Sequence, residues 1–169
     1  MSKVNRGVQF EKMIADGFSN VPNTIVIRLK DPQNGYAGNN NPCDYIVYRE
    51  PILYCIECKS TYGNTLSISS NNVRHHHGNI SDFQWDSLLN YSTYKGVISG
   101  YMIWFIDHDK TIFVPATYLK KLYSQGKKSL NIRLDCDTNE CFEIEGKKKR
   151  ILFEYNMKDF MENYGNFNI

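Results

Sequence analysis

Residues 42–59, PCDYIVYREPILYCIECK, contain the strongest indication of the fold in this sequence. Two runs of β-branched and aromatic residues flank a short turn at 49–51, and residues of these types favour strands. The pattern predicts a β-hairpin with one strand over 44–49 and the other over 52–60. A hairpin of this kind fixes which side chains share a face.

Three polar side chains of this hairpin are predicted to converge. Because side chains alternate between the faces of a strand, Glu57 and Lys59 should emerge on the same face of the second strand. Asp44 opens the partner strand and can lie beside them. Two carboxylates are costly to bring together unless a cation such as Mg²⁺ neutralises them, and Mg²⁺ binds through one or two carboxylates plus substrate phosphates. With the lysine steadying a phosphate or a bound water, this is the chemistry of metal-assisted phosphodiester hydrolysis.

The same residues also fit a plainer interpretation. An acid and a lysine two residues apart commonly form a solvated strand face, and short motifs often arise by chance. Context favours the functional interpretation, because an aspartate heads the preceding strand and an amino-terminal helix carries another acid.

That amino-terminal helix is predicted from the spacing of the apolar residues after Asn5. They fall mostly along one helical stripe: Val8, Phe10, Met13, Ile14 and Phe18. Gly17 and the polar cluster at 20–23 end the helix. Glu11 lies in the first turns, near Arg6. It can approach the metal site or simply favour the positive end of the helix, and both alternatives stay open.

The remaining elements complete an α/β pattern. A second helix should span 81–93, with Ser81 as N-cap and Gln84, three residues on, as its capping-box partner. Further strands are expected at 24–29, 100–106 and 111–115, and further helices at 117–123 and 156–164. Helices flanking a mixed sheet make the fold class α/β. The length suits one domain, 1–169, in which 165–169 is expected to be a flexible tail.

The overall charge does not by itself indicate a partner. The 169 residues carry a formal net charge of +2, so nucleic-acid binding would need locally concentrated charge. Basic clusters at 120–121, 127–128 and 147–150 can supply it, although each also fits an ordinary solvated turn. The sequence has no long apolar run and no basic-then-apolar leader, so we expect no membrane partner and a cytoplasmic location.

Cysteines and histidines offer a second possible metal site. Cys55 and Cys58 have zinc-knuckle spacing, but on a strand their thiols point to opposite faces, and the pair at 136 and 141 is too widely spaced in sequence. We interpret the five cysteines as buried, reduced structural residues, as a reducing compartment allows. His75, His76 and His77 lie in a polar loop at 69–81, where they can contact metal, phosphate or DNA or simply be exposed.

The order of these motifs resembles that of the PD-(D/E)XK nuclease superfamily. Asn5-Arg6-Gly7 with Phe10-Glu11, Asp44-Tyr45, Glu57-Cys58-Lys59 and Phe83-Gln84 follow one another as they do in that superfamily. Within it the chain most resembles the RecU-type Holliday-junction resolvases of Gram-positive bacteria and their phages, over nearly its whole length. The resemblance implies a restriction-endonuclease-like fold and a phage-encoded, Mg²⁺-dependent, structure-selective DNA endonuclease. Such an enzyme would act as a homodimer that makes paired symmetric cuts in four-way junctions, and Mn²⁺ could substitute for Mg²⁺.

The resemblance also implies roles for individual residues. Asp44 and Glu57 would ligate the metal, and Glu11 would complete its shell. Lys59 would position the nucleophilic water at the scissile phosphate, and Gln84 would help to orient the water or a metal ligand. Expected DNA contacts, with Arg6 facing the backbone, are Asn5, Arg6, Lys30, Arg74, His76 and His77.

Two departures from the family pattern affect these expectations. Cys43 separates the motif proline from Asp44, which is tolerable because the acid is the working group. More important, the segment 30–43 reads as a flexible loop, where the bacterial proteins place a stalk thought to enter the junction. Junction selectivity is thus less firmly implied than nuclease chemistry. The alternatives are a restriction- or repair-type endonuclease of the same fold and a non-catalytic DNA-binding module.

Overall fold

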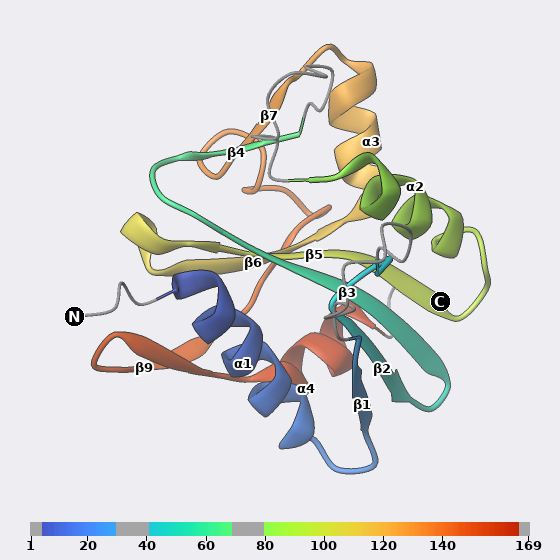
Figure 1. The fold of residues 1–169 in the computed structure, drawn as a ribbon, viewed down its shortest axis with the longest axis vertical. Helices are drawn as coiled ribbons and strands as arrows, with labels where there is room; N and C mark the ends of the chain where they lie inside the picture. The colour runs from blue at the N-terminus through green and yellow to red at the C-terminus, as the bar shows by residue number, and fades with distance from the viewer. Residues whose placement is uncertain (1–4, 30–40, 69–79, 166–169) are drawn as a thin grey trace, which may run out of the picture.

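The fold is built on one mixed six-stranded sheet. A computed structural model describes residues 5–29, 41–68 and 80–165. The strand order is β1-β2-β3-β5-β6-β8 (Figure 1). The strands are β1 (Ile25–Arg28), β2 (Tyr45–Arg49), β3 (Ile52–Thr61), β5 (Val97–Phe105), β6 (Lys110–Pro115) and β8 (Phe142–Glu143). The predicted α/β class with a mixed sheet is confirmed.

The predicted hairpin lies near the middle of this sheet. β2 and β3 are antiparallel, with Tyr45 opposite Ile56 and Arg49 opposite Ile52. β3 then pairs in parallel with β5, and β5 returns antiparallel into β6. The long β3 therefore has a neighbour on each side, and most of its side chains are buried. A strand buried in this way holds its polar side chains in place.

Helices cover both faces of the sheet. α1 (Arg6–Ser19) and α4 (Met157–Asp159), which continues as a π-helical turn over Phe160–Tyr164, pack on one face. α2 (Asp82–Tyr91) and α3 (Ala116–Ser124) pack on the other (Figure 1). Each face has its own apolar cluster: Phe10, Tyr54, Ile56 and Phe160 belong to the first, and Leu88, Tyr101, Ile103 and Leu119 to the second. All four predicted helical regions are confirmed, with end shifts of a few residues.

Several short strands have no counterpart in the sequence prediction. β4 (Thr65–Ser67) pairs with β7 (Ser129–Asn131), and β9 (Gly146–Lys149) pairs with β10 (Leu152–Tyr155). β9 reads Gly-Lys-Lys-Lys, which has neither apolar alternation nor β-branched residues. The pattern that predicts a strand is therefore missing there.

Some sequence expectations fall at the borders of the described residues. Of the expected loop 30–43, residues 30–40 lie outside the described part of the chain, as do 69–79. The expected tail at 165–169 was wrong at its first residue, because Gly165 is buried; a Cβ there would come within 2.3 Å of the Tyr54 hydroxyl. Among the described residues, no helix has both the length and the apolar character needed to cross a membrane.

Candidate active site

The strand register places Asp44 beside Glu57. Asp44 directly precedes β2, and its backbone N–H donates to the carbonyl of Ile56 at 3.1 Å. One carboxylate oxygen of Asp44 accepts a hydrogen bond from the backbone N–H of Cys58 at 2.7 Å. The hairpin backbone thus holds the Asp44 side chain against β3.

Glu57, Lys59 and Gln84 form one hydrogen-bonded group. Glu57 Oε1 accepts from Lys59 Nζ at 2.6 Å and from Gln84 Nε2 at 2.7 Å. Lys59 Nζ also lies 3.3 Å from Gln84 Oε1. The predicted common face of Glu57 and Lys59 is therefore confirmed, and α2 contributes the third member.

Burial changes the charge equilibrium of the Glu57 carboxyl group. Glu57 is 2% exposed, whereas the Lys59 side chain is 20% exposed and reaches toward solvent. The pKa of Glu57 is raised to about 7: burial, the largest cause, and the nearby charge of Asp44 raise it, while the Lys59 ammonium and the hydrogen bonds from Lys59 and Gln84 lower it. A buried carboxyl group with a strongly raised pKa is typical of functional sites.

The second oxygen of Glu57 is the clearest feature pointing to a ligand. Glu57 Oε2 is buried and has no hydrogen-bond partner among the described residues. A buried polar atom without a partner costs free energy, so such atoms in functional sites usually receive a ligand. With Asp44 beside it, the oxygen belongs to the hard, anionic donor type that Mg²⁺ prefers. The residues present therefore fit a divalent cation.

The start of α2 explains the position of Gln84. Ser81 caps the helix, because its hydroxyl accepts from the Gln84 backbone N–H at 3.3 Å. The predicted N-cap is confirmed, but the predicted capping box is not. The Gln84 side chain turns toward Glu57 and Lys59, since a buried carboxylate is a stronger hydrogen-bond partner than an exposed backbone amide.

Glu11 does not join Asp44 and Glu57 in a three-carboxylate group. Its carboxylate pairs with Arg28 of β1 at 2.6 Å, and its backbone carbonyl accepts from the Tyr45 hydroxyl at 3.1 Å. Within the described ranges, no three His, Cys, Asp or Glu side chains lie close enough to hold a metal together. The expected ligand shell is therefore reduced to Asp44 and Glu57 in this structure.

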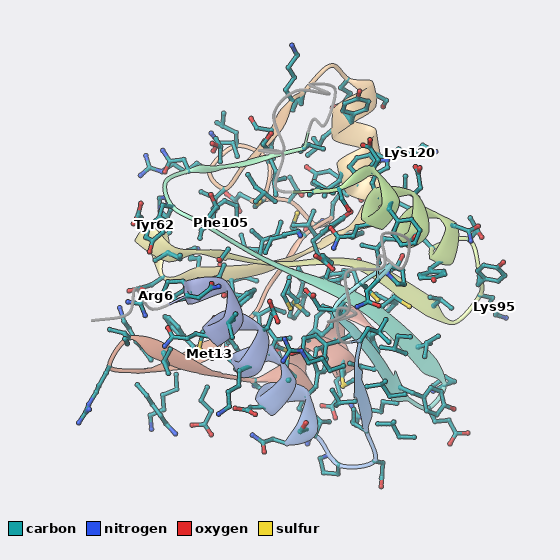
Figure 2. All side chains as sticks on the ribbon, viewed as in Figure 1. Arg6, Met13, Tyr62, Lys95, Phe105 and Lys120 are labelled. Atoms are coloured by element: carbon teal, nitrogen blue, oxygen red, sulfur yellow. The ribbon has the colours of Figure 1, made fainter. Side chains whose placement is uncertain are left out.

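The expected DNA contacts are only partly described. Asn5 is the N-cap of α1, and its side-chain oxygen accepts from the N–H groups of Gly7 and Val8. Sequence reasoning missed this structural role, although an asparagine before an apolar helical run is a known N-cap signal. Arg6 begins α1 (Figure 2), with one guanidinium nitrogen 3.0 Å from Gln9 Oε1. Lys30, Arg74, His76 and His77 lie outside the described residues.

The cysteines do not form a metal site. Cys55 and Cys58 enter the apolar clusters on opposite faces of the sheet, as predicted. Cys136 and Cys141 contact each other despite their sequence spacing, and hydrogen bonding to Cys136 together with burial raises the pKa of Cys141. The expectation that all five are buried was wrong for this pair, which is partly exposed.

Tyr101 is a neighbour of the site that sequence reasoning missed. It lies directly opposite Glu57 in the β3–β5 ladder, and its buried hydroxyl has no hydrogen-bond partner among the described residues. Burial raises the pKa of Tyr101, and the charge of Glu57 raises it further. Only the parallel pairing of β3 with β5 brings the two side chains together, and no local pattern announces that pairing.

Comparisons with known proteins add little at the sequence level. No protein-family model matches the chain, and no curated protein sequence matches it. Among solved structures, it is similar to Hjc of Archaeoglobus fulgidus, described as a Holliday junction resolvase from an archaeal hyperthermophile. The identity is 14% and the TM-score 0.47, over 82% of this chain and 88% of that one. A likeness of this strength does not indicate a function for this chain.

Proposed function

We propose that this protein is a metal-dependent DNA endonuclease that cuts branched DNA, with the four-way junction as its preferred substrate. One observation carries the proposal. Asp44, just before β2, converges with Glu57 and Lys59 of β3 and Gln84 of α2, and the buried Glu57 Oε2 has no hydrogen-bond partner within the described part of the chain. This combination is suited to phosphodiester hydrolysis and has no evident structural purpose.

Asp44 and Glu57 would hold the cation, with Mg²⁺ the expected ion and Mn²⁺ a substitute. Both side chains offer carboxylate oxygens, and a phosphate oxygen of the substrate can share the cation with them. When bound, the cation would supply charge neutralisation at the scissile phosphate and ease deprotonation of water. Glu11 contributes at most indirectly, because Arg28 already pairs with its carboxylate.

Lys59 and Gln84 would arrange the reacting groups. The ammonium of Lys59 lies 2.6 Å from Glu57 on the more exposed side of the group, where it can meet a phosphate oxygen or hold a water molecule. Gln84 contacts both Glu57 and Lys59, so it fixes the position of each relative to the other. The backbone N–H of Cys58 similarly fixes Asp44. Such preorganisation is the main contribution a protein makes to this chemistry.

The choice of branched DNA follows from the motif order and its resemblance to the RecU-type resolvases. Resolving a junction requires two cuts related by a two-fold axis, and a symmetric homodimer supplies two sites in that relation. A homodimer is therefore part of the proposal.

The test uses a labelled four-way junction and a linear duplex with the sequence of its arms. Each is incubated with purified protein in Mg²⁺, Mn²⁺ or EDTA. We expect metal-dependent, symmetric cuts in the junction and slower cutting of the duplex. Equal cutting of both substrates would favour a restriction- or repair-type nuclease, and binding without cutting in either metal would favour a DNA-binding module.

A further inference from the structure

The β9–β10 hairpin is a projecting arm with a firmly packed base. Figure 1 shows it extending from the body of the protein beside the amino end of α1. At its base the Tyr155 hydroxyl lies 2.7 Å from the Thr111 hydroxyl, and farther along, opposite Lys148, the backbone N–H of Phe153 lies 3.0 Å from the Met13 sulfur. Gly146 lets the strands close, since a Cβ there would come within 2.8 Å of the Tyr155 ring. The arm is thus anchored to α1 and β6.

The outer part of this arm is strongly basic. Residues 147–150 are Lys-Lys-Lys-Arg, and all four are exposed. Lys148 pairs with Asp109 and Lys149 with Glu154, both in exposed ion pairs. No ion pair of Lys147 or Arg150 occurs within the described ranges. Exposed ion pairs contribute little to stability, so a polyanion can compete for Lys148 and Lys149 as well.

A chain of contacts connects the arm to the strand that carries the candidate active site. Asp109, the partner of Lys148, ends the turn between β5 and β6. Asp107 in the same turn accepts from the backbone N–H of Gly63 at 2.7 Å, and His108 lies 2.6 Å from Asn64. Gly63 and Asn64 follow the end of β3, which carries Glu57 and Lys59. The arm and the end of β3 therefore lie at the same end of the sheet.

Two labelled side chains mark this end of the molecule in Figure 2. Arg6, at the start of α1, and Tyr62, just after β3, lie on the side of the view toward which the arm extends. Lys95 and Lys120 lie at the opposite side. The arm and Arg6 therefore lie toward the end of the molecule where β3 finishes, whereas Lys95 lies toward the end where β3 begins.

We propose that the β9–β10 arm binds the phosphate backbone of a DNA duplex that leads into the active site. The inference rests on the proposed function and names the surface that would hold one arm of the branched substrate. A row of exposed cations on a rigid hairpin complements the regular negative charge of a duplex, and backbone contacts of this kind dominate affinity that is independent of sequence. Phosphate contacts would also orient the DNA without reading its bases.

A structural role for these lysines is the competing explanation. Both strands of a two-stranded sheet are edges, and lysines on edge strands discourage pairing with other molecules. If that were their purpose, removing them would cause aggregation and leave DNA affinity unchanged.

The test compares two matched sets of charge removals. One variant carries Lys147→Gln, Lys149→Gln and Arg150→Gln; the control carries Lys12→Gln, Lys95→Gln and Lys158→Gln, which also removes three exposed cations. Equilibrium binding to a labelled duplex and to a four-way junction is measured in EDTA over a range of salt concentrations. Melting temperature and light scattering establish that each variant is folded and not aggregated.

We expect the arm variant to bind both DNAs more weakly than the wild type, by roughly tenfold or more. The slope of log affinity against log salt concentration should be shallower by about 2 to 3, because each lost phosphate contact changes that slope by about 0.9. The control should retain the wild-type slope. An arm variant with wild-type affinity and slope would overturn the inference, as would equal losses in the two variants. Failure of the wild-type protein to bind any DNA would instead overturn the proposed function.

Discussion

At the scale of single residues, the surroundings of Glu57 point most directly to a bound cation. One of its oxygens contacts Lys59 and Gln84, while the other has no partner among the described residues. A purely structural glutamate would be expected to satisfy both oxygens, because burial without a partner is costly. A cation bound at this oxygen would remove that cost.

Lys59→Ala should lower the cleavage rate steeply, by roughly a hundredfold or more, because the ammonium is proposed to act at the nucleophile and the scissile phosphate. Metal affinity should change little, since the lysine is not a ligand. Single-turnover cleavage and metal titration of the same preparation measure the two effects. Lys95→Ala, an exposed lysine away from the site, is the matched control. Wild-type turnover by Lys59→Ala would show that this lysine has no part in catalysis and is only a surface residue of the strand.

The stability of the metal-free protein should depend on pH through Glu57. Because the folded protein raises the pKa of Glu57 from 4.5 to about 7, it favours the protonated form, and this contribution is complete below pH 4.5. It is lost as the pH rises through about 7, at a cost of roughly 3 kcal/mol at most.

The measurement is the difference in free energy of unfolding between the wild type and Glu57→Gln, in EDTA, across that pH range. The wild type should lose stability relative to the variant as the pH rises, and added Mg²⁺ should restore part of it. A difference that stays flat would mean that Glu57 titrates normally in the folded protein.

At the scale of elements, the sequence predicted what local patterns determine. The β2–β3 hairpin was predictable because its apolar runs and turn are contiguous, and the Ser81 cap because capping is local. The neighbourhood of Glu57 and Tyr101 was not predictable, since it requires the pairing of β3 with β5 across a helix. Nor was the β9 strand, whose lysines resemble an ordinary solvated turn.

Asn5 has two candidate roles, as the N-cap of α1 and as a DNA contact, and substitutions can separate them. Its observed role is to cap α1, so Asn5→Ala should lower the free energy of unfolding by about 1 kcal/mol, whereas Asn5→Ser should nearly preserve it. Denaturant unfolding measures this effect. DNA affinity, measured in parallel, addresses the second role. A loss of affinity in the serine variant with full stability would show that the amide also contacts DNA.

At the scale of the whole molecule, the proposed chemistry requires two active sites. Sedimentation of the protein should give the mass of a dimer, both free and on a junction. Mixing wild-type protein with excess Glu57→Gln should yield heterodimers that nick one strand and resolve few junctions. Full resolution by a protein that remains a monomer on its substrate would contradict the dimer proposal and leave the active-site assignment intact.

Asp44 and Glu57 are proposed to form the metal site of a nuclease. The most direct measurement is the single-turnover rate of junction cleavage in saturating Mg²⁺ for the wild type, Asp44→Asn and Glu57→Gln, with junction binding measured in the same preparations. The substitutions keep side-chain size and remove the charge that would hold the cation. We predict metal-dependent cleavage by the wild type, none detectable in either variant, and junction affinity within a few-fold of wild type in all three. Cleavage by both variants at the wild-type rate would contradict the claim.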